Sequence, residues 1–541
     1  MKISKINIKN FRSIIDIWID FEKGRNIYAL IGANNSGKTN ILDAIGLVLD
    51  AGKFYKYEFE DTDFYNKDTN NPIEIIAELV DPIEYTNVYK KEYKINKFTL
   101  RVKKYVRGDQ KGIVHTEYYC AGIDSSGMQS DPLLDSDQIQ GQKLPLRAKD
   151  HIYKVGDIYY LEPHRIMNFF KVTGWGPLGR LFQVYREDFL KTNTTYNGIP
   201  CKEAFLTNAE ELKKILKTKK LKEIELKLLS NLSTYLGLEK GTDFNINLGY
   251  PSPEVFIEKL IELSIKENKT LEDINIEKLG SGYLSLFRIA ALQALAEIKE
   301  KKDNILLIEE PEAYLHPHLR RFFYKVLKKI AENGNQIIYT THSTEFVELE
   351  EYKSIIKVFK ENNATTKDKQ ISQGTQLSFD AIGRKLKGNE EIYFCNFVTL
   401  MEGQNDSISL KILFEKKRLE LDSKSISIIN CNGKGNIKSY IDICNELEIS
   451  YFVIFDYDKG NALSMSDSSN ILSKLKDRQN QHFMFEKSLE SELGLSKNCR
   501  TEDVIAILEP LSYEDIVKKY PKLIEAFDKN FAYLKSKGFF N

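Results

Sequence analysis

The stretch NIYALIGANNSGKTNILDAIGLVLD, residues 26–50, decides the fold of the first part of this chain. It begins with a short apolar run typical of a buried strand and ends with a pattern typical of an apolar helix. Between them, GANNSGKT fits the G-x-x-x-x-G-K-[ST] phosphate-loop pattern. In such a loop, backbone N–H groups wrap a phosphate, Lys38 neutralises its oxygens and the Thr39 hydroxyl ligates Mg²⁺. The sequence therefore predicts an α/β fold with a nucleotide site. The residues expected to contact the nucleotide are Gly32, Asn34, Asn35, Ser36, Gly37, Lys38, Thr39 and Asn40.

A second half of this site is predicted far downstream, at ILLIEEP, residues 305–311. An apolar strand that ends in paired acids suits a magnesium-bound triphosphate, with Glu309 holding the metal through water and Glu310 polarising the attacking water. A lone pair of acids would more often be a solvated strand edge. The phosphate loop favours the functional interpretation.

The segment around this acid pair has the pattern of a βαβ unit. NILLIEE and QIIYTT are apolar strands, and HLRRFFYKVLKKIAENG between them has helical periodicity. Gly334 suits the C-terminal cap of that helix. The residues predicted to form its buried face are Leu319, Phe322, Phe323, Val326, Leu327 and Ile330.

In the order of these motifs, the chain resembles the ABC/SMC/RecF class of ATPases. IKNFRSI (8–14) is similar to the start of that class, LGSGYLS (279–285) to its signature loop, PEAYLHP (311–317) to its D-loop and THS (341–343) to its switch histidine. The resemblance implies that ATP is bound between two copies of the chain. It adds Arg12, Ser281, Gly282 and His342 to the nucleotide-binding residues. A glutamate at position 309, where aspartate is usual, is typical of the RecF-like and OLD-like branches.

The C-terminal part carries a second group of acids at predicted strand ends. LMEGQND contains Glu402 and Asp406, VIFDYD contains Asp456 and Asp458, and KSLESEL offers Ser488 and Glu490. So many converging carboxylates would repel one another unless divalent cations lay among them. Taken alone, the E-G strand suits a capped turn and the D-x-D strand a ribose-binding acid.

Together, these acids resemble the Toprim domain, in which an E-G strand is followed by a D-x-D strand. Asp406 and NGKGN (432–436) are similar to the version found in the OLD (overcoming lysogenisation defect) family, which includes the GajA-like proteins of antiphage defence. The resemblance implies a two-metal site for cutting phosphodiesters with Mg²⁺, or with Mn²⁺ or Ca²⁺. Its implied metal ligands are Glu402, Asp406, Asp456, Asp458, Ser488 and Glu490, and Lys537 is similar to a late catalytic lysine of the family.

The predicted organisation is an ABC/SMC-like ATPase domain with a helical insertion, followed by a Toprim α/β domain. The ATPase domain spans residues 1–177 and 266–385, and the Toprim domain spans residues 390–541. The insertion at 178–265 has a Lys/Glu/Leu-rich helical pattern and is expected to serve in dimerisation.

Bulk properties limit the possible classes of protein. With 78 basic and 78 acidic residues the net charge is zero, so nucleic acid must be met by local patches. The candidates are Arg101, Lys103, Lys104 and Arg107, and the cluster 213–222, whose interleaved glutamates favour a solvated helix face. Six scattered cysteines without a CxxC pair predict neither zinc nor disulfides, and so a reducing, cytoplasmic location. No apolar stretch reaches 18 residues, which predicts no membrane span.

The main functional hypothesis is an ATP-regulated, metal-dependent DNA endonuclease or nickase. Its expected partners are double-stranded DNA, further copies of the chain as a dimer or dimer of dimers, and a co-encoded helicase or other defence component. An alternative is an ATP-driven DNA clamp of RecF or SMC type with a non-catalytic Toprim module. A topoisomerase or primase is disfavoured, because only about eighty residues follow the D-x-D motif.

Overall fold

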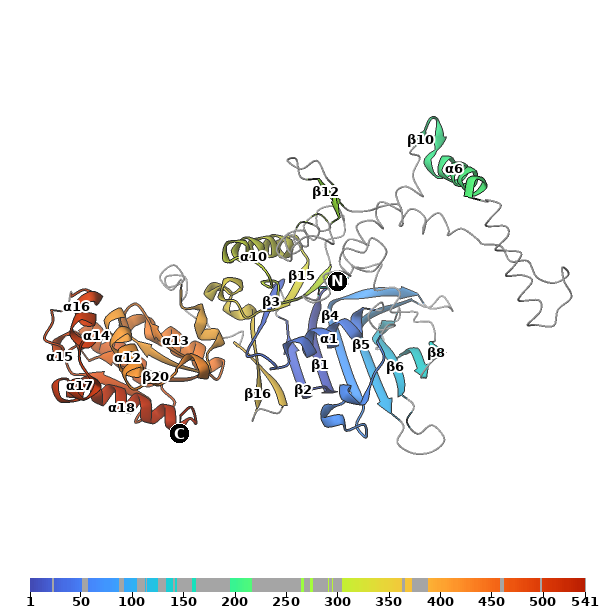
Figure 1. Ribbon diagram of the computed structural model, residues 1–541. Helices are drawn as coiled ribbons and strands as arrows, with labels where there is room; N and C mark the ends of the chain where they lie inside the picture. The colour runs from blue at the N-terminus through green and yellow to red at the C-terminus, as the bar shows by residue number, and fades with distance from the viewer. Residues whose placement is uncertain are drawn as a thin grey trace, which may run out of the picture. The chain divides into compact units, whose positions relative to one another are not determined.

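Two sheets with helix α1 (Lys38–Leu49) between them form the N-terminal part of the chain (Figure 1). The computed structural model describes residues 1–21, 24–50, 57–86, 92–104, 112, 114–124, 133–139, 142–143, 158–161, 195–216, 264–266, 273–275, 290, 294, 304–361, 365–371, 388–457, 462–496 and 499–540. By its contacts the chain divides into two units, one of residues 1–163 with 301–541 and one of residues 164–300.

The first sheet is antiparallel and has the strand order β2-β1-β4-β5-β6-β7-β8. Alternate residues of β1 and β4, such as Ile6, Ile8, Ile73 and Ile75, are buried against α1. This alternation is the expected pattern for a sheet with one face on a core. Its strands are β1 (Ile3–Phe11), β2 (Ile14–Asp20), β4 (Ile73–Thr86), β5 (Glu92–Lys104), β6 (Val114–Asp124), β7 (Leu133–Ile139) and β8 (Gln142–Lys143).

The second sheet has the order β17-β16-β3-β15-β14-β9 and is parallel except for its edge strand β17. Its central strands are apolar throughout, because both faces of a parallel sheet are covered. The strands are β3 (Ile27–Ile31), β9 (Ile158–Leu161), β14 (Ile305–Glu309), β15 (Gln336–Thr340), β16 (Ile355–Glu361) and β17 (Thr365–Gln370). The parallel pair β14–β15 with α10 (Pro317–Glu332) confirms the predicted βαβ unit.

Two residues of α10 differ from the predicted buried face, and one of them, Leu319, is only partly buried. Phe322 was expected on the buried face, but its side chain is 55% exposed. The buried stripe includes Phe323, Val326 and Leu327, and Phe322 lies about 100° round the helix from Phe323, on the side away from Leu327. Gly334 follows the helix with a φ of 95°, as expected for its C-terminal cap.

The C-terminal part is a four-stranded parallel sheet of order β19-β18-β20-β21. Its strands are β18 (Phe397–Met401), β19 (Ile426–Asn430), β20 (Ser450–Asp456) and β21 (His482–Phe485). Its helices are α12 (Gln404–Lys416), α13 (Lys434–Glu446), α14 (Ala462–Lys474), α15 (Leu489–Glu492), α16 (Thr501–Leu508), α17 (Tyr513–Lys519) and α18 (Pro521–Ser536). Because the chain order reverses between β18 and β20, this sheet has its topological switch point there, where α/β domains bind ligands.

The unit of residues 1–163 with 301–541 also contains short 3₁₀ helices. They are η1 (Asp61–Asp63), η2 (Tyr65–Lys67), η4 (Thr344–Phe346), η5 (Leu349–Ser354), η6 (Glu390–Phe394) and η7 (Asp422–Lys424). Within the described residues, no helix is both long and apolar enough to span a bilayer.

The unit of residues 164–300 is described in part. It contains β10 (Thr195–Tyr196), β11 (Ile199–Pro200), α6 (Cys201–Leu216), β12 (Ser264–Lys266) and β13 (Asp273–Asn275). Of the predicted helical insertion at 178–265, helix α6 lies among the described residues, and most of the remainder lies outside them.

Candidate nucleotide and nuclease sites

The phosphate loop lies between β3 and α1, as predicted. Gly32 has a φ of 147° and Gly37 a φ of 107°, backbone angles that residues other than glycine rarely adopt. Asn35, also in the loop, has a φ of 61°. The loop therefore turns sharply and leads its backbone into the N-terminus of α1, the geometry that binds anions.

Lys38 is buried beneath this loop, with its ammonium bonded to the carbonyls of Gly32 (3.0 Å) and Ala33 (2.9 Å). Burial lowers the pKa of Lys38 to about 8, while the nearby carboxylates of Glu310, Glu312 and Glu309 act in the opposite direction. The ammonium is thus held between the loop and the acids of β14.

The acids at the end of β14 lie where the sequence predicts them. The Thr39 hydroxyl donates a hydrogen bond to Glu309, so the two predicted magnesium-binding groups are neighbours. Glu310 has a φ of 43°, and its N–H donates to the carbonyl and the hydroxyl of Thr340, both at 3.1 Å. A left-handed backbone in a residue other than glycine is uncommon and often marks a functional position.

His342 follows the end of β15, and the positive charge of Lys38 acts on its ring. Burial and Lys38 lower the pKa of His342, against the effect of Glu310. Its backbone N–H donates to the carboxylate of Glu312 (2.6 Å), which also accepts a hydrogen bond from the Thr341 hydroxyl (2.9 Å). Sequence reasoning missed Glu312, although it lies inside the PEAYLHP motif; burial raises its pKa.

Arg12 lies beside α1, but acids already engage its guanidinium. It pairs with Asp43 (2.6 Å) and Asp63 (3.1 Å) and contacts Asn40 (3.2 Å). Burial acts to lower the pKa of Arg12, yet Asp43 and Tyr57 raise it above its usual value. Its contact with a nucleotide stays a prediction. Ser281 and Gly282 of the predicted signature loop lie outside the described residues.

The hairpin of β16 and β17 covers the phosphate loop. The Thr366 hydroxyl donates to the carbonyl of Ser36 (2.9 Å) and lies 2.5 Å from the Ser13 hydroxyl. A Cβ on Gly37 would lie 2.3 Å from Thr366 Oγ1, and one on Gly32 would lie 1.9 Å from the carbonyl oxygen of Val358. The two glycines are therefore required by close packing as well as by their φ angles.

The C-terminal acids lie at the carboxyl ends of the parallel strands. Glu402 follows β18 and accepts a hydrogen bond from the backbone N–H of Asp456, the last residue of β20 (3.1 Å). Asp406, in the first turn of α12, accepts one from the N–H of Gly403 (2.9 Å). A Cβ at position 403 would lie 3.1 Å from that carboxylate, which explains the glycine of the E-G pair.

The pKa of Asp406 reflects its burial and the charges of the neighbouring acids. Burial, and then the charges of Glu490 and Glu402, raise its pKa to about 8. Carboxylate oxygens are ligands that divalent cations prefer, so the residue types at this site suit such an ion. Among the described residues, however, no three acidic, histidine or cysteine side chains are arranged to hold one ion. Asp458 of the D-x-D motif lies outside the described residues.

Two further predicted residues have different surroundings. Ser488 is buried, and its hydroxyl caps α15 by accepting from the N–H of Ser491 (3.3 Å). Lys537 does not join the acids. It is exposed at the end of α18, 5.1 Å from the ring centroid of Tyr533. Its charge acts on Asp477, which precedes β21 and so lies near the amino ends of the strands.

Asn405 is a residue that sequence reasoning missed. Its amide donates to Glu490 Oε1 (3.0 Å), while its oxygen accepts from the hydroxyl of Thr501 (3.1 Å). Asn405 therefore orients Glu490 toward Asp406. Its place between Glu402 and Asp406 in the sequence was the available signal.

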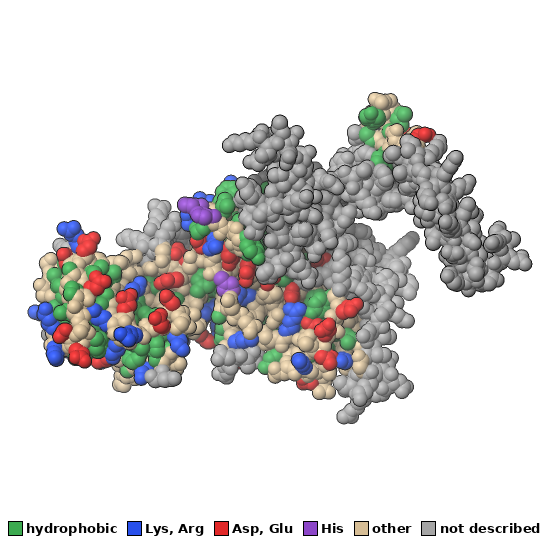
Figure 2. All heavy atoms as spheres, viewed as in Figure 1, with side chains coloured by type: hydrophobic (Ala, Val, Ile, Leu, Met, Phe, Trp, Pro, Cys, Tyr) green, Lys and Arg blue, Asp and Glu red, His purple; other side chains and the backbone are tan. Residues whose placement is uncertain are grey.

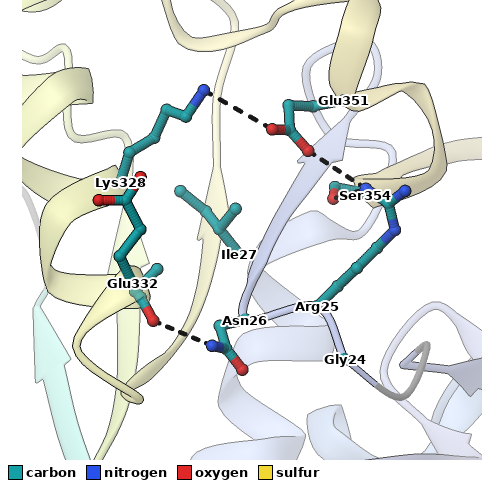
Figure 3. Close-up of a pocket in the computed structure, with 9 residues that line it drawn as sticks. Gly24, Arg25, Asn26, Ile27, Lys328, Glu332, Glu351 and Ser354 are labelled. Carbon is teal, nitrogen blue, oxygen red and sulfur yellow. Dashed lines mark hydrogen bonds and ion pairs between the residues drawn. The ribbon is translucent and has the colours of Figure 1, made fainter.

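A cavity of about 480 Å³ lies away from both sites, at the start of β3 (Figure 3). Glu351 pairs there with Arg25 (3.2 Å) and Lys328 (3.6 Å). Asn26 donates to the carbonyl of Ala331 (2.9 Å). The cavity lies at the amino end of β3, whereas the phosphate loop follows the carboxyl end of that strand. The charged side chains of the cavity pair with one another, so the cavity belongs to neither site.

The predicted basic cluster of β5 is largely neutralised. Lys103 pairs with Glu117 (2.7 Å) and Lys104 pairs with Asp61. Arg107 lies outside the described residues, as do 217–222 of the second cluster. Basic and acidic side chains are interspersed over the described part of the face in Figure 2. These lysines therefore offer little free charge to DNA.

The two sites define a protein class in which a phosphate-loop ATPase domain precedes a Toprim-type α/β domain. Comparison with known families agrees: the AAA ATPase domain family matches residues 1–153 and 178–347, and the TOPRIM domain of overcoming lysogenization defect protein-like proteins matches residues 393–458. The chain therefore belongs to the AAA ATPase domain family and carries an OLD-like Toprim domain. The predicted fold class, an α/β ATPase domain followed by a Toprim α/β domain, is confirmed, whereas the helical insertion and its role in dimerisation stay predictions.

Several curated relatives are similar to this chain. The OLD nuclease of Thermus scotoductus is 26% identical over 527 residues, which cover 92% of each chain. The Old nuclease of Escherichia phage P2 is 28% identical over 43% of this chain and 42% of its own. The endonuclease GajA of Bacillus cereus is 23% identical over 47% of each. The chain, similar to these nucleases, is thus a nuclease enzyme with an ATPase domain and an OLD-like Toprim domain. These two domains imply the use of a nucleotide and a divalent metal.

Proposed function

We propose that this protein is a divalent-metal-dependent DNA endonuclease or nickase whose cutting is regulated by ATP bound to the ATPase domain. The observation that carries the proposal is the group of acids at the carboxyl ends of β18 and β20, where burial and repulsion raise the pKa of Asp406 to about 8. A resident cation would remove that repulsion. The proposed ion is Mg²⁺, with Mn²⁺ or Ca²⁺ able to occupy the same acids.

The chain's own residues account for the shape of this site. Glu402 holds the backbone N–H of Asp456, so β18 and β20 present their acids in a fixed relation. Asn405 holds Glu490 toward Asp406. Cations bound by these acids would activate water and stabilise the charge that develops on the phosphodiester. Asp458 and Ser488 are further proposed ligands. Lys537, given its position, has no part in the proposal.

Regulation by nucleotide is supported by the β16–β17 hairpin. One side of it contacts the phosphate loop through Thr366. Two lysines of the same hairpin contact the Toprim domain. Lys357 donates to the carbonyl of Cys395 (2.9 Å), just before β18, and Lys369 pairs with Glu448 (2.8 Å), which follows α13. A change in the loop on binding ATP can thus reach the Toprim domain through one element.

We also propose a dimer or dimer of dimers, double-stranded DNA as substrate and a role in antiphage defence, with a co-encoded component such as a helicase as a further partner. A nucleic-acid substrate is supported by the relatives, which are an OLD nuclease, a phage P2 nuclease and an endonuclease. The assembly, the role in defence and the partner rest on the resemblance of the sequence motifs to the ABC/SMC/RecF class and the OLD family.

The test is cleavage of supercoiled plasmid by the full chain with Mg²⁺ or Mn²⁺, with and without ATP. Wild type should produce nicked or linear DNA, and Asp456→Asn should not. Asp528→Ala, which removes an exposed acid of α18 in the same domain, is the matched control and should cut normally. Lys38→Ala should abolish any difference between reactions with and without ATP. Absence of cutting by wild type under every nucleotide and metal condition would favour the DNA clamp instead.

A further inference from the structure

Lys434, the first residue of α13, is a buried cation beside the Toprim acids. Its side chain is 6% exposed. The ammonium donates to the main-chain carbonyl of Asp456 and to the hydroxyl of Ser464 (2.7 Å), and it lies 5.4 Å from the ring centroid of Phe455. Lysine is almost never fully buried unless it is paired, so this arrangement requires a reason.

The bonds of Lys434 join three separate elements. The lysine follows β19, Asp456 is the last residue of β20, and Ser464 lies in the first turn of α14. The ammonium therefore ties together the two ends of the segment that connects β20 to α14, and that segment contains Asp458. The carbonyl it holds belongs to the residue whose side chain is one of the proposed ligands.

We infer that Lys434 is a positioning residue of the acid site, which fixes the end of β20 and hence the direction in which Asp456 presents its carboxylate. This inference rests on the proposed nuclease function, since it assigns a role toward the cation of that site. Groups that orient ligands without touching the ion commonly contribute ten- to a hundredfold to its affinity.

The direction of the effect separates positioning from simpler roles. If Lys434 only filled space, its loss would lower stability and leave cation affinity unchanged. If it acted only through its charge, its loss would tighten cation binding, because like charges repel. Positioning alone predicts weaker cation binding when the lysine is removed.

The experiment is a titration of the nucleotide-free full chain with Mn²⁺, in which free Mn²⁺ is followed by electron paramagnetic resonance. Asp456→Asn identifies the binding that belongs to the acid site. Lys434→Met should weaken that binding about tenfold. Ser464→Ala removes one of the two acceptors and should weaken it less. Lys438→Met, one turn further along α13, is the control and should bind as wild type does.

Folded Lys434→Met with wild-type or tighter Mn²⁺ affinity would overturn the inference. If that variant does not fold, Ser464→Ala decides: weaker binding supports positioning, and unchanged binding refutes it. Wild type that binds no Mn²⁺ sensitive to Asp456→Asn would instead refute the proposed function, and this inference with it. The two failures are therefore distinguishable.

Discussion

The two acid clusters of this chain differ in what balances their charge. In the ATPase domain the carboxylates of Glu309, Glu310 and Glu312 act on the buried ammonium of Lys38. In the Toprim domain the charges that act on Asp406 are those of Glu490 and Glu402, and its pKa rises to about 8. The phosphate-loop cluster therefore includes a lysine that can contact the phosphates of a nucleotide, whereas the charges that raise the pKa of Asp406 are all negative. A nucleotide and a metal are the corresponding ligands.

The largest effect expected from this difference is on catalysis. Asp456→Asn should reduce plasmid cleavage by at least about a thousandfold, or roughly 4 kcal/mol of barrier, because it removes a charge proposed to hold the reacting metal. ATP affinity, measured by fluorescence of a nucleotide analogue, should remain that of wild type. A variant that loses both properties together would show that the two sites do not have separate roles.

A second comparison concerns the glycines of the two loops. Gly32 and Gly433 both have positive φ angles, of 147° and 113°. A Cβ at Gly32 would meet the carbonyl oxygen of Val358 at 1.9 Å, whereas nothing lies within 4 Å of one at Gly433. Gly32→Ala should therefore combine strain with overpacking and cost about 2 kcal/mol more than Gly433→Ala.

Thermal unfolding of the two full-length variants without ligands measures this difference. If Gly433→Ala lowers the melting temperature as much as Gly32→Ala does, the hairpin does not constrain the phosphate loop. Loss of ATP binding in Gly32→Ala alone would agree with the comparison.

Lys357 allows the contact between the hairpin and the Toprim domain to be tested by pH. Burial lowers its pKa from 10.5 to about 8, so between those values the unfolded chain binds more protons than the folded one. Its contribution to stability therefore rises with pH across that window. Relative to Lys357→Met, wild type should gain about 1 to 2 kcal/mol between pH 8 and 10.

Differential scanning fluorimetry of both proteins across this range gives the comparison. Tyrosines and other groups titrate in both and cancel in the difference. A constant difference in melting temperature would mean that Lys357 titrates alike in the folded and unfolded states.

Much of this arrangement was predictable from sequence because it depends on local patterns. The loop before α1, the acids at the ends of β14, β18 and β20, and the βαβ unit all follow from apolar runs and from residues at strand ends. Parallel strands bring their carboxyl ends to one edge, so such acids converge without further information.

What could not be predicted depends on partners distant in the chain. Thr366 covers Gly37 across more than three hundred residues. The sequence does not show that Arg12 pairs with Asp43 and Asp63. Lys537 was suggested by resemblance to a family motif, and such a motif does not show which end of the sheet α18 reaches. The sequence motifs do not predict that Asn405 donates to the Glu490 carboxylate, or that Lys434 donates to the main-chain carbonyl of Asp456.

The smallest predicted effect tests the acid that most needs a cation. Because the pKa of Asp406 is raised from 3.8 to about 8, the folded chain binds more protons than the unfolded chain between those values. Its contribution to stability therefore falls as pH rises through that window. Asp406→Asn removes the repulsion, and its amide oxygen can still accept from the N–H of Gly403.

In metal-free buffer at pH 9, Asp406→Asn should be more stable than wild type by about 1 kcal/mol, and the gain should shrink toward pH 5. Added Mn²⁺ should raise the melting temperature of wild type and leave that of the variant nearly unchanged, because binding to the folded state requires the ionised carboxylate. Stabilisation by Mn²⁺ that is equal in both proteins would place the metal away from Asp406. A more stable variant that no longer responds to metal would instead show that this acid cluster trades stability for cation binding.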